Sequence, residues 1–138
     1  MSTLKTTLAG YTQYRGREGQ ISFLLHRVTG LGTLLFLAIH ILDTATVYFF
    51  PNLYADATNI YRTTIFGLAE MGLLFCVFYH GVNGLRIAYF DMIAPKGWEI
   101  PSERKTALWT LGITLVIWLP SVLIMGRNLL INNFGLGG

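Results

Sequence analysis

The chain has 138 residues, of which 53% are hydrophobic and only 12% are charged, and its formal net charge is +3. Soluble domains carry about 25% charged residues, so this composition excludes an ordinary soluble domain. The apolar residues gather in three nearly charge-free runs of about the twenty residues that a membrane-spanning helix needs. No polar stripe follows these runs, as it would in a soluble helical bundle. We therefore predict an all-α membrane protein with three transmembrane helices, in a single membrane-anchor domain over residues 1–138.

In chain order, the first predicted span covers residues 22–50 and follows a polar stretch that lacks the apolar start of a cleavable signal. Pro51 ends this span, and the connecting segment after it is rich in tyrosine, as membrane interfaces are. The second span covers residues 63–91 and the third residues 105–127. The loop between them contains two prolines, and we interpret it as a docking surface for a soluble partner. Small and polar residues within the spans predict that the three helices form part of a multi-subunit helical bundle surrounded by membrane lipid.

Basic residues predict the orientation, because they concentrate on the cytoplasmic side of membrane proteins. Arg62 and Arg127 lie at one end of the predicted bundle, and the other lysines and arginines lie at the opposite end. We therefore predict that the N-terminus is inside, and the lack of a targeting segment favours a bacterial inner membrane. The positive charge then reflects topology, and we expect no nucleic-acid partner. The residues of the basic end are Lys5, Arg15, Arg17, Arg27, Arg86, Lys96, Arg104 and Lys105.

His80 is the most informative single residue, because it lies inside the second apolar run. An imidazole in lipid needs a partner, and ionisable residues at membrane depth are functional candidates. Haem fits this position, since a neutral imidazole can bind iron, and Gly81 and Gly84 leave a surface without side chains for the macrocycle. From spacing alone, a histidine that is hydrogen-bonded to a neighbouring helix is an equal alternative.

His26 and Arg27 open the first span. Arg27 either extends towards lipid head groups or, with His26, pairs with haem propionates or a partly reduced quinone. His40 lies on nearly the same helical face as His26, about 21 Å further along the axis. Asp43 follows one turn later, where it can orient the His40 ring. This spacing indicates a second haem ligand, with a metal-free His40–Asp43 pair as the alternative.

Two segments match more specific patterns. The segment Ser22-Phe-Leu-Leu-His-Arg-Val-Thr-Gly30 contains His-Arg-x-Thr-Gly, and Tyr79-His-Gly-Val-Asn-Gly-Leu-Arg-Ile-Ala-Tyr-Phe-Asp91 contains Tyr-His-x-x-x-Gly-x-Arg-x-x-x-x-Asp. Both resemble signatures of the succinate dehydrogenase cytochrome b family, the membrane anchors of respiratory complex II. The order of the two signatures and the three-helix length also agree, so the resemblance covers most of the chain.

The resemblance implies a membrane anchor that has no catalytic activity alone. Such an anchor passes electrons from a flavoprotein subunit and an iron–sulfur subunit to quinone, either ubiquinone or menaquinone, beside a second membrane-anchor subunit. It implies that His80 is an axial ligand of haem b iron. It also implies that His26 and Arg27 lie near the haem propionates, and that Arg27 lies near the quinone.

The chain departs from the family pattern at three positions. Phe23 stands where the family has a serine near the quinone. Ser22 lies one residue earlier, about 100° around the helix, and is the candidate for that role here. Ile87 replaces the family histidine that follows the signature arginine. His40 is not part of the signature and stays a candidate ligand for a second haem shared with the partner.

Other functions also agree with these residues. A haem-free structural anchor that binds quinone would need a protein partner for His80. A fumarate reductase anchor differs only in the direction of the reaction. A proton-coupled transporter would use Glu70, Asp43 and the histidines, but it predicts inverted repeats or broken helices that the sequence lacks.

Overall fold

A computed structural model describes residues 17–135, apart from the side chains of residues 17, 97, 98, 100 and 101. Four α-helices and no strand occur in this part of the chain, so the predicted all-α fold is confirmed. Lys5 and Arg15, which entered the prediction of orientation, lie outside the described residues. The elements are α2 (Arg17–Phe49), α3 (Pro51–Tyr61), α4 (Thr64–Met92), the 3-10 helix η1 (Pro95–Trp98) and α5 (Ile100–Phe134).

Three of these helices are long and apolar enough to cross a membrane, which confirms the three predicted spans. The third helix is longer than predicted, because it continues through Asn128 and Asn132 to Phe134. It ends at Gly135, whose φ of 64° is a left-handed conformation that glycine adopts without steric cost. The candidate spans are Glu18–Phe49, Thr64–Met92 and Ser102–Phe134.

The segment between the first two spans is a helix, which the sequence analysis did not predict. Pro51 does end the first span, but it also stands in the first turn of α3, where its missing N–H costs no hydrogen bond. No residue of α3 is buried. The hydroxyl of Tyr61 at its end donates a hydrogen bond of 2.9 Å to Oδ1 of Asp43 in α2. This bond raises the pKa of Tyr61, because the neutral phenol is the donor. It joins the end of α3 to the last two turns of α2.

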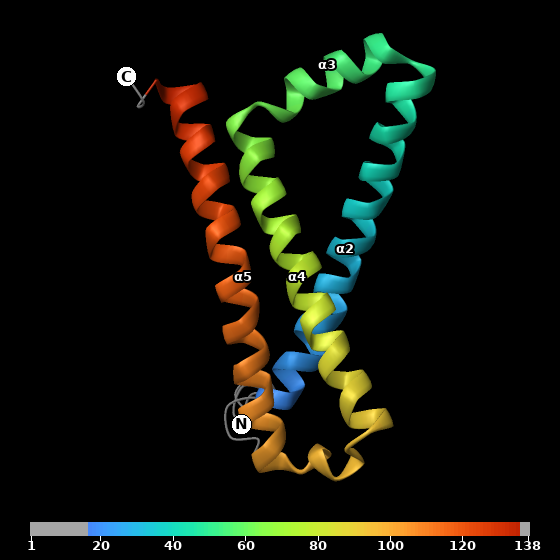
Figure 1. Ribbon diagram of the computed structural model, residues 1–138, viewed down its shortest axis with the longest axis vertical. Coiled ribbons are helices and arrows are strands. Elements are labelled where there is room, and N and C mark those ends of the chain that lie inside the picture. Colours follow the sequence, from blue (N-terminus) through green and yellow to red (C-terminus); the bar gives the residue numbers. More distant parts are fainter. Residues whose placement is uncertain (1–16, 136–138) are drawn as a thin grey trace, which may run out of the picture.

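The helix α4 contacts both other long helices (Figure 1). Near η1, α2 begins close to α4 and α5, and Glu18 of α2 pairs with Arg104 of α5 at 3.4 Å. Towards α3, α2 diverges from α4, so that α2, α3 and α4 together outline a triangle (Figure 1). The interhelical contacts of α2 are therefore concentrated in its first half.

Two glycines let α2 and α4 approach each other at their crossing. A Cβ atom at Gly30 would lie 2.9 Å from Cε1 of His80, and one at Gly32 would lie 2.7 Å from Sγ of Cys76. Both distances are shorter than a van der Waals contact. Small residues at a crossing allow this close packing in membrane proteins, and any side chain here would push His80 or Cys76 away.

The three spans bury little of their apolar surface against one another. In the most apolar stretch of each span, only 6%, 11% and 11% of the residues are buried inside the structure. The most completely buried side chains are Tyr79, Asn83 and Thr114, two of which are polar. Because helices in lipid gain little from hiding apolar side chains from each other, the exposed apolar surface is available to lipid and to other subunits.

Candidate functional site

His26 and His80 meet where α2 crosses α4. Their rings stack with centroids 4.1 Å apart and planes 8° from parallel. Nδ1 of His80 also lies 3.0 Å from the backbone carbonyl oxygen of His26. Because a carbonyl only accepts hydrogen bonds, Nδ1 carries the hydrogen and Nε2 keeps the lone pair. A hydrogen bond of this kind orients a histidine whose other nitrogen binds a metal.

His26 has a nitrogen without a partner. Its Nδ1 is the only buried side-chain polar atom in the described part of the chain that makes no hydrogen bond. A buried donor or acceptor without a partner costs free energy. The stacking also limits what the pair can do. Because imidazole lone pairs lie in the plane of the ring, two stacked imidazoles cannot both bind a metal ion placed between them.

Arg27 and Ser22 lie in different surroundings. The side chain of Arg27 is exposed on α2, with its guanidinium carbon 5.5 Å from the centre of the Phe23 ring. Ser22 is only 5% exposed. Its hydroxyl donates to Oδ1 of Asn83 at 3.2 Å and lies 3.3 Å from the hydroxyl of Tyr79. The arginine can therefore reach a ligand on the surface of α2, whereas the serine hydroxyl is engaged between helices.

His40 lies apart from the stacked pair. It is exposed, and its ring stacks on that of Phe36 with centroids 5.7 Å apart. Asp43 accepts its hydrogen bond from Tyr61, and no hydrogen bond joins Asp43 to the His40 ring in the part of the chain that the structure describes. Within residues 17–135, no three His, Cys, Asp or Glu side chains form a group that could hold a metal ion.

The structure adds a polar cluster around Arg86, a residue that entered the sequence predictions through orientation and as the arginine of the second signature, without a contact being assigned to it. Nη1 of Arg86 donates to Oγ of Ser22 and to Oδ1 of Asn83, both at 3.1 Å. On the α5 side, Nε donates to Oγ1 of Thr106 at 3.0 Å, and Nη2 donates to the carbonyl oxygen of Glu103 at 3.4 Å. One guanidinium thus joins all three long helices at the end of the bundle where α2 begins.

The sequence does contain a signal for this cluster. Tyr79, Asn83 and Arg86 follow each other at spacings of four and three residues, which places them on one face of a helix. Polar residues within a span face protein rather than lipid. The sequence alone does not show which residues of α2 and α5 this face contacts.

We expect Arg86→Leu to lower the stability of the assembled complex by about 2 kcal/mol. The substitution removes three hydrogen bonds between helices, and such bonds contribute about 0.6 kcal/mol each in membrane proteins. The measurement is the midpoint of thermal unfolding of the purified complex. Arg104→Leu is the matched control, because it removes an exposed arginine from α5 whose ion pair with Glu18 contributes little. Equal shifts in the two variants would contradict a stabilising role for the cluster.

Comparison with known proteins agrees with this arrangement. Residues 5–120 match the family described as succinate dehydrogenase/fumarate reductase transmembrane subunit. The chain is also similar to the succinate dehydrogenase 2 membrane subunit SdhC of Mycobacterium tuberculosis, with 33% identity over 135 residues. That alignment covers 94% of this chain and 96% of the relative. The chain therefore belongs to the family of succinate dehydrogenase and fumarate reductase membrane subunits, integral membrane proteins that work in a complex with soluble catalytic subunits.

Proposed function

We propose that this subunit binds haem b and contributes to a quinone site, to which electrons pass from succinate through a flavoprotein and an iron–sulfur subunit. Two observations together support the proposal: the chain belongs to this family of membrane subunits, and Nδ1 of His80 is hydrogen-bonded to the carbonyl of His26, a bond that a purely structural histidine would also make. This bond leaves Nε2 of His80 as the nitrogen that can bind iron. Any further protein ligand would then come from a second membrane-anchor subunit, since His26 is stacked on His80.

The residues around His80 fit such a cofactor. Gly30 gives the imidazole its place against α2, because a Cβ there would collide with the ring. The exposed guanidinium of Arg27 can donate to propionate oxygens, and His26 would lie beside them as its neighbour on α2. A haem held here supplies a one-electron carrier at membrane depth.

Arg27 is the residue that we assign to quinone. Its planar guanidinium presents several donors in a fixed fork, which suits a carbonyl oxygen that gains negative charge during reduction. Its exposed position on α2 allows a ligand to approach from the membrane or from a partner subunit. Ser22 is the other candidate from the sequence, and its buried hydroxyl supports a structural role better than a direct contact with quinone.

We also propose an orientation of the subunit in the membrane. We place the start of α2 on the inner side of a bacterial inner membrane, where Arg86, Arg104 and η1 also lie. The iron–sulfur subunit would then dock on the same side as Arg27, which shortens the path for electrons. The end that carries α3 would face outward.

A pyridine haemochrome assay on the purified complex tests this function, together with succinate-dependent quinone reduction. We expect about one haem b per copy of the chain, because the geometry offers a single histidine with an oriented, available nitrogen. Two haems would favour His40 as the ligand of the second. A complex that reduces quinone without any haem would contradict the haem assignment and leave a haem-free anchor.

A further inference from the structure

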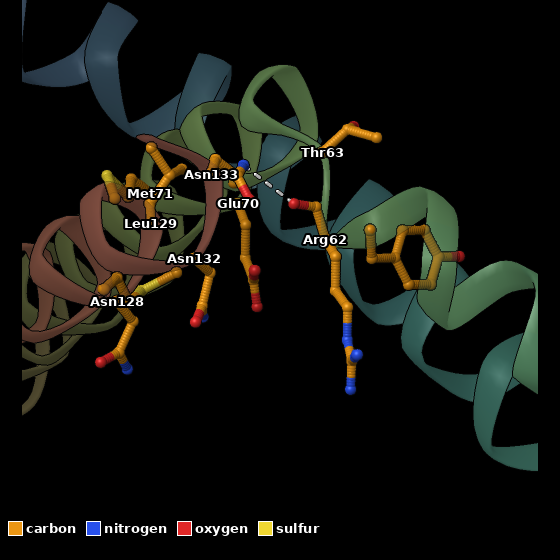
Figure 2. A pocket seen from close by; sticks show the side chains of 11 residues that line it. Arg62, Thr63, Glu70, Met71, Asn128, Leu129, Asn132 and Asn133 are labelled. Carbon is orange, nitrogen blue, oxygen red and sulfur yellow. Dashed lines mark hydrogen bonds between the residues drawn. The ribbon is translucent and has the colours of Figure 1, made fainter. Parts of the chain in front are cut away.

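A cavity of about 770 Å³ opens at the α3 end of the bundle, between the start of α4 and the last turns of α5 (Figure 2). Its floor is apolar and its rim is polar and exposed. Figure 2 shows three rim side chains that project in the same direction. The floor includes Met71, Met125 and Leu129, and these three rim residues are Arg62, Glu70 and Asn132.

Side-chain contacts between α5 and the start of α4 hold the walls of this cavity. Nδ2 of Asn133 in α5 donates to the carbonyl oxygen of Arg62 and to Oγ1 of Thr64, both at 3.0 Å. Deeper in the cavity, a Cβ atom at Gly67 would lie 2.5 Å from Cδ1 of Leu129, so the two helices are in close contact. The shape of the cavity therefore depends on the packing of α4 against α5.

The rim carries one positive and one negative charge that do not neutralise each other. Neither Arg62 nor Glu70 takes part in an ion pair with any residue of the described chain. The dipole of α4 adds positive potential at its N-terminus, next to Arg62. No acidic residue in the first turn of α4 offsets this potential. Thr63 does not cap this turn, since its hydroxyl donates to the carbonyl of Ile60.

The position of the cavity indicates what can reach it. It lies at the ends of two membrane-spanning helices, Thr64–Met92 and Ser102–Phe134, and thus near the level of the lipid head groups. An occupant must match an apolar floor, a cation and an anion at once. A phospholipid with a zwitterionic head group does so, because it carries a phosphate, an ammonium group and apolar chains.

We propose that this cavity binds the head group of a zwitterionic phospholipid from the surrounding bilayer. The phosphate lies against Arg62, the ammonium group against Glu70, and the first part of the acyl chains on the apolar floor. A free phosphate ion or a purely anionic head group would leave Glu70 facing a negative charge. An uncharged ligand would leave both rim charges without a partner. This site is independent of the haem and quinone sites proposed above.

The test is lipid add-back to the purified, delipidated complex, with the melting temperature as readout. A ligand that binds the folded state stabilises it by RT ln(1 + [L]/Kd), so the rise in melting temperature over a series of lipid concentrations gives the apparent affinity. We expect phosphatidylethanolamine to raise it, and phosphatidylglycerol or inorganic phosphate to do so much less. Arg62→Gln and Glu70→Gln should each weaken the apparent affinity for phosphatidylethanolamine about threefold, the size expected for exposed charge pairs.

Arg127→Gln is the matched control, because Arg127 is an exposed arginine at the same end of α5 that does not line the cavity. An unchanged affinity in this variant supports the site, and an equal loss would show a general charge effect and overturn it. Equal responses to phosphatidylglycerol or phosphate, or unchanged binding in Arg62→Gln and Glu70→Gln, would also overturn it. Haem content and quinone reduction, measured on the same preparations, report separately on the proposed function.

Discussion

We expect the complex that carries His80→Ala to lose nearly all of its haem b. Nε2 of His80 is the only nitrogen of the stacked pair that the hydrogen-bond pattern leaves oriented as an iron ligand. Removing residues that merely orient a metal ligand weakens binding 10- to 100-fold in other proteins, so loss of the ligand should exceed about 100-fold. The measurement is the haemochrome absorbance per complex, together with the reduced-minus-oxidised spectrum.

His40→Ala is the control for this experiment, because His40 is an exposed histidine in the same chain that does not contact the pair. We expect the complex that carries His40→Ala to retain its haem. Alanine at position 80 also removes a contact between α2 and α4, so assembly of the complex should be checked by size-exclusion chromatography. His80→Gln provides a second test, since it keeps a donor for the His26 carbonyl but has no imidazole. Normal haem content in both His80 variants would refute the assignment.

The second large effect concerns Arg27. We expect Arg27→Ala to lower the rate of quinone reduction by about 10- to 100-fold, which corresponds to the loss of one hydrogen bond to a charged group. Haem should remain bound, because His80 still provides the iron ligand. Arg27→Lys should be intermediate, since it keeps the charge but loses the planar fork.

The measurement is the steady-state rate of succinate-dependent quinone reduction at several quinone concentrations. Succinate oxidation with a soluble electron acceptor should stay normal in the same samples, because it bypasses the membrane site. Arg104→Ala is the matched control, since Arg104 is an exposed arginine near the same end of the bundle. Unchanged quinone kinetics in Arg27→Ala would exclude Arg27 from the quinone site.

The sequence predicted the three spans well because lipid imposes a strong constraint on composition. The sequence predicted the ends of the spans less well. The third helix extends past Asn128 and Asn132, which a hydropathy argument treats as the end of a span, although nothing prevents polar residues from continuing a helix outside the hydrocarbon. The connection after Pro51 became α3 because proline is well tolerated in a first turn and no later residue of the segment breaks a helix.

The sequence supplies the candidate residues of the site but not their arrangement. The residue types identified His26, His80 and Arg27 as candidates, but the stacking of the two rings depends on how α2 crosses α4. That crossing is set by Gly30 and its contact with His80, a pairing between distant segments that spacing along one helix cannot show. Asp43 was predicted to orient His40, yet it accepts a hydrogen bond from Tyr61, because the side chain of Tyr61 reaches α2 from the end of α3.

The helical state of α3 has a consequence for assembly. A helix of 11 residues is about 16 Å long, whereas packed helices lie 8–10 Å apart. Since α3 spans the distance between the end of α2 and the start of α4 (Figure 1), these two ends cannot close on each other while α3 stays helical. Their separation is about twice one packing distance, so a single additional helix could contact both. The chain thus sets this spacing in advance, which reduces the conformational entropy that the chain itself loses when a subunit binds.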